Sequence, residues 1–126
     1  MKKTIIKTEN APAPIGPYNQ AIKTDTTLYV SGQIAINPKT GALEMNSIEE
    51  ETEMVMKNLK AVIQAAGLTM ENIVKTCIFI SDMNNFSKIN TVYGSYFEKD
   101  FPARETVEVS VLPKNVNVEI SCIAVF

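Results

Sequence analysis

The sequence predicts an α/β sandwich of the α+β type, in which two helices cover one face of a mixed sheet. Two segments place apolar residues at helical spacing, other segments alternate apolar and polar residues as strands do, and the two kinds follow one another in the order β-β-α-β-α-β-β. The chain has 126 residues, 45% of them hydrophobic. This is enough for a core without disulfides or metal, so we expect one domain over residues 1–126.

The clearest early strand is the segment 28–34, Leu-Tyr-Val-Ser-Gly-Gln-Ile, which is rich in residues that favour strands. The Pro-rich segment 11–17 precedes it and reads as an extended loop, because proline fixes its own φ and restricts the residue before it. This loop is expected to hold Tyr18 with little conformational freedom. The residues 37–41, Asn-Pro-Lys-Thr-Gly, form the turn that closes the strand.

Both helices are marked by their ends and by an apolar stripe. Ser47 and Glu50 form a capping-box pattern that predicts a helix start, and Gly67 stands where a left-handed residue ends a helix. The second helix is expected from about Asn84 until Phe101-Pro102 stops it. The stripe of the first helix is Val55, Leu59, Val62 and Ala66, and that of the second is Phe86, Ile89, Tyr93 and Phe97.

Three further strands complete the predicted sheet. The segment 74–81 is largely apolar on both faces and lies between the two helices. The segments 106–111 and 116–126 alternate clearly, and the residues 113–115 between them are predicted to be a hairpin turn. The alternate residues of the last strand that we expect under the helices are Val116, Val118, Ile120, Cys122 and Ala124.

Two helices can cover only one face of such a sheet. The other face would still carry Ile123, Val125 and either Cys77 or Ile78, and no further segment of the chain remains to cover them. We therefore expect a homo-oligomer in which subunits pack their open sheet faces together.

Composition narrows the possible functions. Twelve basic and fourteen acidic residues give a net charge of −2 and a pI near 5.2, which disfavours a nucleic-acid partner. Histidine is absent, so no Ser-His or Cys-His nucleophile can form. No phosphate-loop, dinucleotide-binding or metal-ligand pattern occurs, so neither a cofactor nor a metal is expected.

The location is predicted from cysteine usage and from the lack of targeting signals. Cys77 and Cys122 lie 45 residues apart with no C-x-x-C motif, which favours reduced thiols that fill space in the core. No signal peptide and no stretch of transmembrane length is apparent. We expect a cytoplasmic protein that does not bind membranes.

Two charged residues stand out as candidates for chemistry. Arg104 is the only arginine among twelve basic residues, and its guanidinium could bind a carboxylate through two N–H groups. Glu119 lies in mid-strand between two apolar residues, where a carboxylate is costly unless it faces water or a pocket. The simpler alternatives are a surface ion pair for Arg104 and a solvent-facing side chain for Glu119.

Tyr18, Ser31 and Gly32 are weaker candidates. Tyr18 could offer a phenol to a ligand or simply cover the edge of the core. Gly32 interrupts an apolar strand, which indicates a bulge, a close ligand or a packing requirement. Ser31 has no base partner, which argues against a serine hydrolase.

Six short motifs are spread over nearly the whole chain: Gly16-Pro17-Tyr18-Asn19-Gln20-Ala21, Tyr29-Val30-Ser31-Gly32-Gln33-Ile34, Asn58-Leu59-Lys60-Ala61-Val62, Pro102-Ala103-Arg104, Leu112-Pro113-Lys114 and Val118-Glu119-Ile120. Together, these motifs resemble the RidA family (reactive intermediate deaminase A, also YjgF/YER057c/UK114). Several separate motifs agree in order and spacing, so the resemblance is specific.

The resemblance implies a chorismate-mutase-like fold and a homotrimer with active sites between subunits. It also implies an enamine/imine deaminase that hydrolyses 2-iminobutanoate and 2-iminopropanoate, the latter formed from 2-aminoacrylate, to 2-oxo acids and ammonia. Arg104 would bind the substrate carboxylate and Glu119 would handle the attacking water. The residues implied to line the pocket are Tyr18, Ser31, Gly32 and Phe86.

One position departs from the family pattern. Thr106 stands where many active members have cysteine, so a thiol has no role there, although a small polar side chain at that position can still contact substrate. The neighbouring Glu105 could compete for Arg104, but strand alternation is expected to point it to the other face. Two alternatives stay open: a non-catalytic regulator that binds 2-oxo acids or related metabolites, and a ribonuclease-type translation inhibitor, which the acidic charge disfavours.

Overall fold

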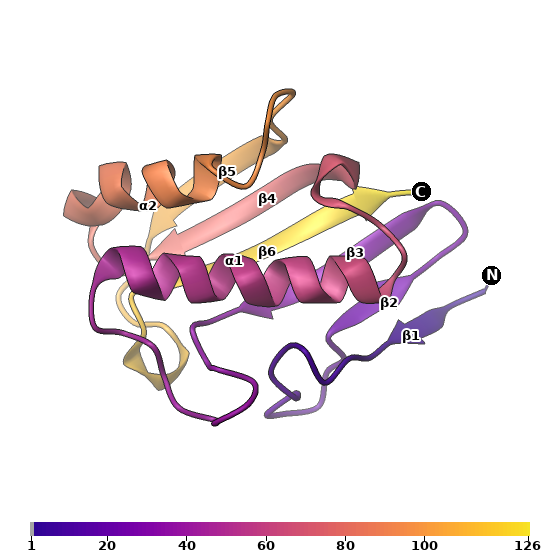
Figure 1. Ribbon diagram of the computed structural model, residues 1–126, viewed down its shortest axis with the longest axis horizontal. Helices are drawn as coiled ribbons and strands as arrows, with labels where there is room; N and C mark the ends of the chain where they lie inside the picture. Colours follow the sequence, from indigo (N-terminus) through magenta and orange to yellow (C-terminus); the bar gives the residue numbers. More distant parts are fainter. Residues whose placement is uncertain (1) are drawn as a thin grey trace.

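The computed structural model describes residues 2–126 as one six-stranded sheet with both helices on the same face (Figure 1). The strand order is β1-β2-β3-β6-β4-β5, and only the β4–β5 pair is parallel. The elements are β1 (Thr4–Ile6), β2 (Ala21–Lys23), β3 (Thr27–Gln33), α1 (Ile48–Ala65), β4 (Ile73–Ile80), α2 (Phe86–Gly94), β5 (Ala103–Glu108) and β6 (Val118–Val125). Three short 3-10 turns join them: η1 (Met70–Asn72), η2 (Met83–Asn85) and η3 (Pro113–Asn115).

Helix α1 begins and ends where the sequence predicts. The Ser47 hydroxyl accepts a hydrogen bond from the Glu50 backbone N–H at 3.1 Å, which caps the first turn. Gly67 follows the helix with φ at +82°, in the left-handed region that favours glycine. Between these ends, Val55, Leu59 and Val62 are fully buried against the sheet. The expected amphipathic helix is confirmed.

The central strand β6 separates a covered sheet face from an open one. Its residues Val118, Ile120, Cys122 and Ala124 are buried under the helices, as predicted. Val116, which precedes the strand, is buried in a separate cluster with Ile34 and Leu112 instead. Burial raises the pKa of the Cys122 thiol to about 12, so this cysteine is an unreactive part of the core.

The opposite face is left open by residues 2–126, as the sequence predicts. Ile123 and Cys77 lie there half-buried and Val125 is exposed, whereas Ile78 belongs to the covered face. Cys77 is therefore not the core residue that we expected. Tyr29 on β3 enlarges the open apolar surface, because about half of its area is exposed.

The arrangement of strands differs from the sequence prediction in two respects. Strands β5 and β6 do not form a hairpin, because β4 lies between them and residues 113–115 form the turn η3. Three strands rather than two precede α1, and two of these, β1 and β2, have three residues each, too few to show alternation.

Helix α2 is also shorter than expected. It ends at Gly94 rather than near Phe101. Glycine is a weak helix former, and the Ser95 hydroxyl donates to the Val92 carbonyl at 2.6 Å, a local bond that competes with helix continuation.

A buried carboxylate joins α1 to the start of β6. Glu51 has no exposed surface, and its oxygens accept hydrogen bonds from the Asn117 N–H at 2.6 Å, the Asn117 side-chain amide at 2.8 Å and the Val118 N–H at 3.1 Å. These three donors satisfy the charge that burial would otherwise penalise. Glu51 thereby fixes the strand just before Glu119.

Within residues 2–126, neither helix has the length and apolar character needed to cross a membrane. The same residues contain no group of three Cys, Asp or Glu side chains arranged to hold a metal ion.

Candidate functional site

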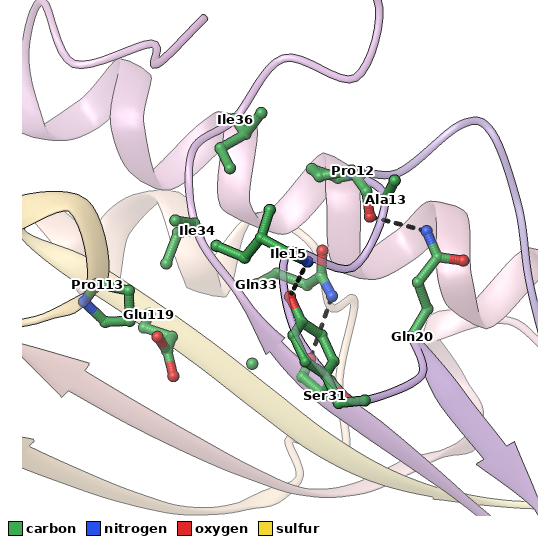
Figure 2. A pocket seen from close by; sticks show the side chains of 12 residues that line it. Pro12, Ala13, Ile15, Gln20, Ser31, Gln33, Ile34, Ile36, Pro113 and Glu119 are labelled. Atoms are coloured by element: carbon green, nitrogen blue, oxygen red, sulfur yellow. Dashed lines mark hydrogen bonds between the residues drawn. The ribbon is translucent and has the colours of Figure 1, made fainter. Parts of the chain in front are cut away.

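A cavity of about 360 Å³ lies between β3, β6 and the Pro-rich loop, and it gathers four of the predicted site residues (Figure 2). These are Tyr18, Ser31, Gly32 and Glu119, which we call the glutamate half-site. The rest of the wall is mostly apolar, with Ile15, Ile34, Ile36 and Pro113 among its residues.

Hydrogen bonds fix the Pro-rich loop and the residues that follow it over this cavity. The buried Gln20 side chain donates to the carbonyl oxygens of Pro12 at 2.9 Å and Ala11 at 3.3 Å. The Ser31 hydroxyl donates to the Asn19 carbonyl at 2.6 Å, and the Tyr18 hydroxyl accepts from the Ile15 N–H at 3.3 Å. Tyr18 and Ser31 therefore also shape the loop that covers the pocket.

Glu119 packs directly against Gly32. The regular pairing of β3 with β6 is interrupted between Val30 and Gln33, and this irregularity places Gly32 beside the carboxylate. A Cβ on Gly32 would lie 2.9 Å from Glu119 Cδ and 3.1 Å from Cγ, so only glycine leaves room for the side chain as it stands. Partial burial raises the pKa of the Glu119 carboxyl above its ordinary value.

Arg104 lies in a second site, formed by β5 and α2. Its Nη1 donates to Asn90 Oδ1 at 2.7 Å, and its Cζ lies 5.5 Å from the centre of the Phe86 ring and 5.3 Å from that of Tyr93. We call Phe86, Asn90, Tyr93 and Arg104 the arginine half-site.

Among residues 2–126, the Arg104 guanidinium has no carboxylate partner. The salt bridge found in this part of the chain joins Lys75 Nζ to Glu105 Oε1 at 3.0 Å. Asp100, Glu98 and Glu105 were the partners expected for an ordinary surface arginine. Glu105 is directed to the open face with Lys75, as alternation predicts, so it leaves Arg104 free.

Thr106 lies two residues after Arg104, on the same face of β5. Its hydroxyl oxygen is buried and has no hydrogen-bond partner among the described residues. Polar atoms in this condition are uncommon in folded proteins.

The two half-sites lie on opposite faces of the sheet. Arg104 pairs with Thr76, which is buried under the helices, whereas Glu119 pairs with Phe79, three residues further along β4. An odd separation along a strand reverses the face. One small ligand therefore cannot contact Arg104 and Glu119 of the same chain.

Asn90 and Tyr93 are site residues that the sequence reasoning missed. They follow Phe86 by four and seven residues, so all three lie on one side of α2. This spacing was the available signal, but Tyr93 was assigned only to the apolar stripe of the helix.

These features define a class: an α/β sandwich that presents a carboxylate and an arginine in separate, partly open half-sites. The family model described as endoribonuclease L-PSP matches residues 8–126, and the chain belongs to this family. It is the family, also called YjgF or RutC and containing RidA, that the sequence motifs indicate.

Individual relatives cover almost the whole chain. The crystal structure of YyfA from Yersinia pestis, described as a protein of unknown function of the conserved Rid family, is 54% identical with a TM-score of 0.96, over 99% of this chain and 100% of YyfA. TdcF from E. coli, solved with bound serine, is 39% identical with a TM-score of 0.94, over 98% of both chains. The mouse 2-iminobutanoate/2-iminopropanoate deaminase is 42% identical over 98% of this chain and 91% of its own.

Proposed function

We propose that this protein is an enamine/imine deaminase that hydrolyses 2-iminobutanoate and 2-iminopropanoate to the 2-oxo acid and ammonia. The observation that carries the proposal is the pair of half-sites: an arginine beside two aromatic rings, with no carboxylate partner among residues 2–126, and a partly buried glutamate at a pocket. The similarity to the mouse deaminase supports the same reaction.

The reaction needs few catalytic groups. Water adds to the imine carbon, the resulting carbinolamine loses ammonia, and a C=O bond replaces the C=N bond. The imine carbon is already electrophilic, so the protein has to orient the acid and move protons to and from one water. Arg104 binds the carboxylate through its free N–H groups, and Glu119 takes the proton of the attacking water and returns it to the leaving nitrogen.

Burial suits Glu119 to this role. A carboxylate with a raised pKa is a better proton acceptor than an exposed one. The mostly apolar wall around it limits access of water to the intermediate.

The complete site belongs to two subunits in this proposal. Since Arg104 and Glu119 of one chain face opposite sides of the sheet, the Arg104 of one subunit meets the Glu119 of its neighbour in a homotrimer. The exposed apolar residues of the open sheet face support association, and the number three rests on the family resemblance. Light scattering should give a mass near 42 kDa, three times 13.9 kDa.

The direct test measures release of ammonia and 2-oxo acid from 2-iminopropanoate generated in situ. We expect Arg104→Ala and Glu119→Gln each to lower kcat/KM by about 100-fold or more, the range of a lost positioning or acid–base group. Glu49→Gln, an exposed carboxylate in the first turn of α1, is the matched control and should keep full activity. A wild-type protein no faster than buffer would refute the deaminase.

Complementation tests the shared site. When Arg104→Ala and Glu119→Gln chains are co-expressed in equal amounts, half of the chains supply an intact arginine and half an intact glutamate. A site built from two chains then has both residues in about a quarter of cases, and about a quarter of wild-type activity returns. Sites built within single chains would recover none.

A second candidate is a non-catalytic protein that binds 2-oxo acids or amino acids. The serine bound to TdcF, a similar structure, favours a carboxylate-bearing ligand without requiring catalysis. Glu119→Gln separates the two functions, because removing a negative charge should preserve or improve binding of an anion while abolishing hydrolysis.

A further inference from the structure

Helix α2 lies along one side of the Arg104 guanidinium. Phe86, Asn90 and Tyr93 form one stripe of this helix, and each contacts or faces the guanidinium of the neighbouring strand β5. Arginine is a long, flexible side chain, so its position at a sheet edge depends on such partners.

Tyr93 is the most firmly held of the three. It is 4% exposed, its hydroxyl is hydrogen-bonded to the buried Thr76 hydroxyl at 2.7 Å, and its ring packs on Phe97 with 5.1 Å between ring centres. Thr76 is also the residue that pairs with Arg104 across β4 and β5. The ring is therefore fixed to β4, at the position that pairs with Arg104 on the neighbouring strand β5.

Asn90 binds the guanidinium through a neutral amide oxygen, so the positive charge of Arg104 is not neutralised. Its Oδ1 accepts from Nη1 at 2.7 Å, which uses one of the five N–H donors of the arginine. The aromatic rings attract the cation through their faces and take no N–H in an ordinary hydrogen bond. Donors remain for a carboxylate, and within residues 2–126 no acidic side chain pairs with the guanidinium.

We propose that Tyr93 and Asn90 are positioning residues that set the affinity for the substrate carboxylate by fixing the Arg104 guanidinium with its charge unpaired. They act through the arginine and do not touch the reacting atoms. The inference rests on the proposed function for the identity of the ligand, although its central claim, control of carboxylate affinity, is independent of turnover.

Substitutions at both positions test the inference. Tyr93→Leu removes the ring, and we expect KM for the imino acid and the Kd for 2-oxobutanoate each to rise about tenfold, while kcat changes less than threefold. This is the range of a cation–π contact once the ligand and the neighbouring subunit cover the guanidinium, which is exposed in the single chain. Tyr93→Phe keeps the ring but loses the bond to Thr76, so it should lower the melting temperature and keep Kd within about threefold of wild type.

Asn90→Asp is the second, nearly isosteric change. It retains an oxygen that accepts from Nη1 but adds a carboxylate that neutralises Arg104, so Kd for 2-oxobutanoate should rise more than tenfold without loss of stability. A purely structural Asn90 would tolerate the change. This variant keeps the test decisive if Tyr93→Leu does not fold.

Calorimetry with 2-oxobutanoate separates failure of this inference from failure of the deaminase. If wild type binds 2-oxobutanoate but releases no ammonia, the deaminase is refuted and the variants still test the positioning. If wild type is active and Tyr93→Leu and Asn90→Asp leave both Kd and KM unchanged, the positioning is refuted. A wild type that neither binds nor reacts overturns both.

Discussion

Substitution of Gly32 by alanine should remove activity without unfolding the protein. The φ of Gly32 is not positive, so alanine fits the backbone. The new Cβ would lie 2.9 Å from Glu119 Cδ, whereas ordinary contacts begin at 3.4 Å. The carboxyl carbon must therefore withdraw by at least 0.5 Å, and its oxygens by more.

The expected loss follows from this displacement. A misplacement of about 1 Å can cost on the order of 100-fold in rate, because the reacting atoms leave their productive geometry. We expect kcat/KM of Gly32→Ala to fall roughly 10- to 100-fold. Since the obstructing atoms are the far end of a flexible side chain, the free energy of unfolding should change by less than about 1 kcal/mol.

Imine hydrolysis and urea denaturation should be measured on the same preparations, with Gly67→Ala as the converse control. Gly67 ends α1 at φ +82°, away from both half-sites, and a side chain there costs about 1 kcal/mol in stability. Gly67→Ala should be less stable and fully active. Our reasoning fails if Gly32→Ala retains full activity, or if its activity falls only in step with its stability.

Other predictions concern buried charges. Glu51→Ala should cost roughly 3–5 kcal/mol in urea denaturation, because it leaves the three N–H donors of Asn117 and Val118 buried without an acceptor, and an unchanged midpoint would contradict this. Hydrolysis should fall as the pH drops through the raised pKa of Glu119, with kcat followed against pH; a flat profile would exclude this carboxylate as the base.

Protonation of Glu119 has opposite effects on activity and on stability. It lowers the rate of hydrolysis but raises the free energy of unfolding. A carboxyl whose pKa is raised on folding contributes stability below its unfolded pKa, near 4.5, and loses that contribution as the pH rises through the folded pKa. Glu119→Gln should therefore be more stable than wild type at pH 7, and thermal melts should show the difference shrinking toward pH 4. A constant difference would contradict the burial argument.

Local signals predicted most of the fold. The Ser47 cap, the Gly67 stop and the alternation through β6 depend on residues close together in sequence, and each was found where expected. The pairing of β5 with β4 could not be read in this way. It depends on the crossover through α2, and the segment 113–115 looks like a turn whichever strands it joins.

Sequence motifs indicated most residues of the candidate site, although not Asn90 and Tyr93, but they did not indicate how the residues are arranged. Tyr18, Ser31, Gly32 and Glu119 share one pocket, yet nothing in their spacing shows that Arg104 lies on the other face of the sheet. That relation depends on strand register across β4, and a single sequence carries no signal for register between distant strands.

The placement of the half-sites on opposite faces also restricts how copies of the chain can associate. Any assembly that brings the Arg104 of one copy to the Glu119 of another joins unlike surfaces. Every copy then uses its Arg104 surface to contact one neighbour and its Glu119 surface to contact another. Such heterologous contacts end only when the rotation between neighbours closes a ring, and otherwise they extend into a filament. A substitution that alters the angle between neighbours by a few degrees could therefore leave each site intact and still convert a soluble particle into a fibre.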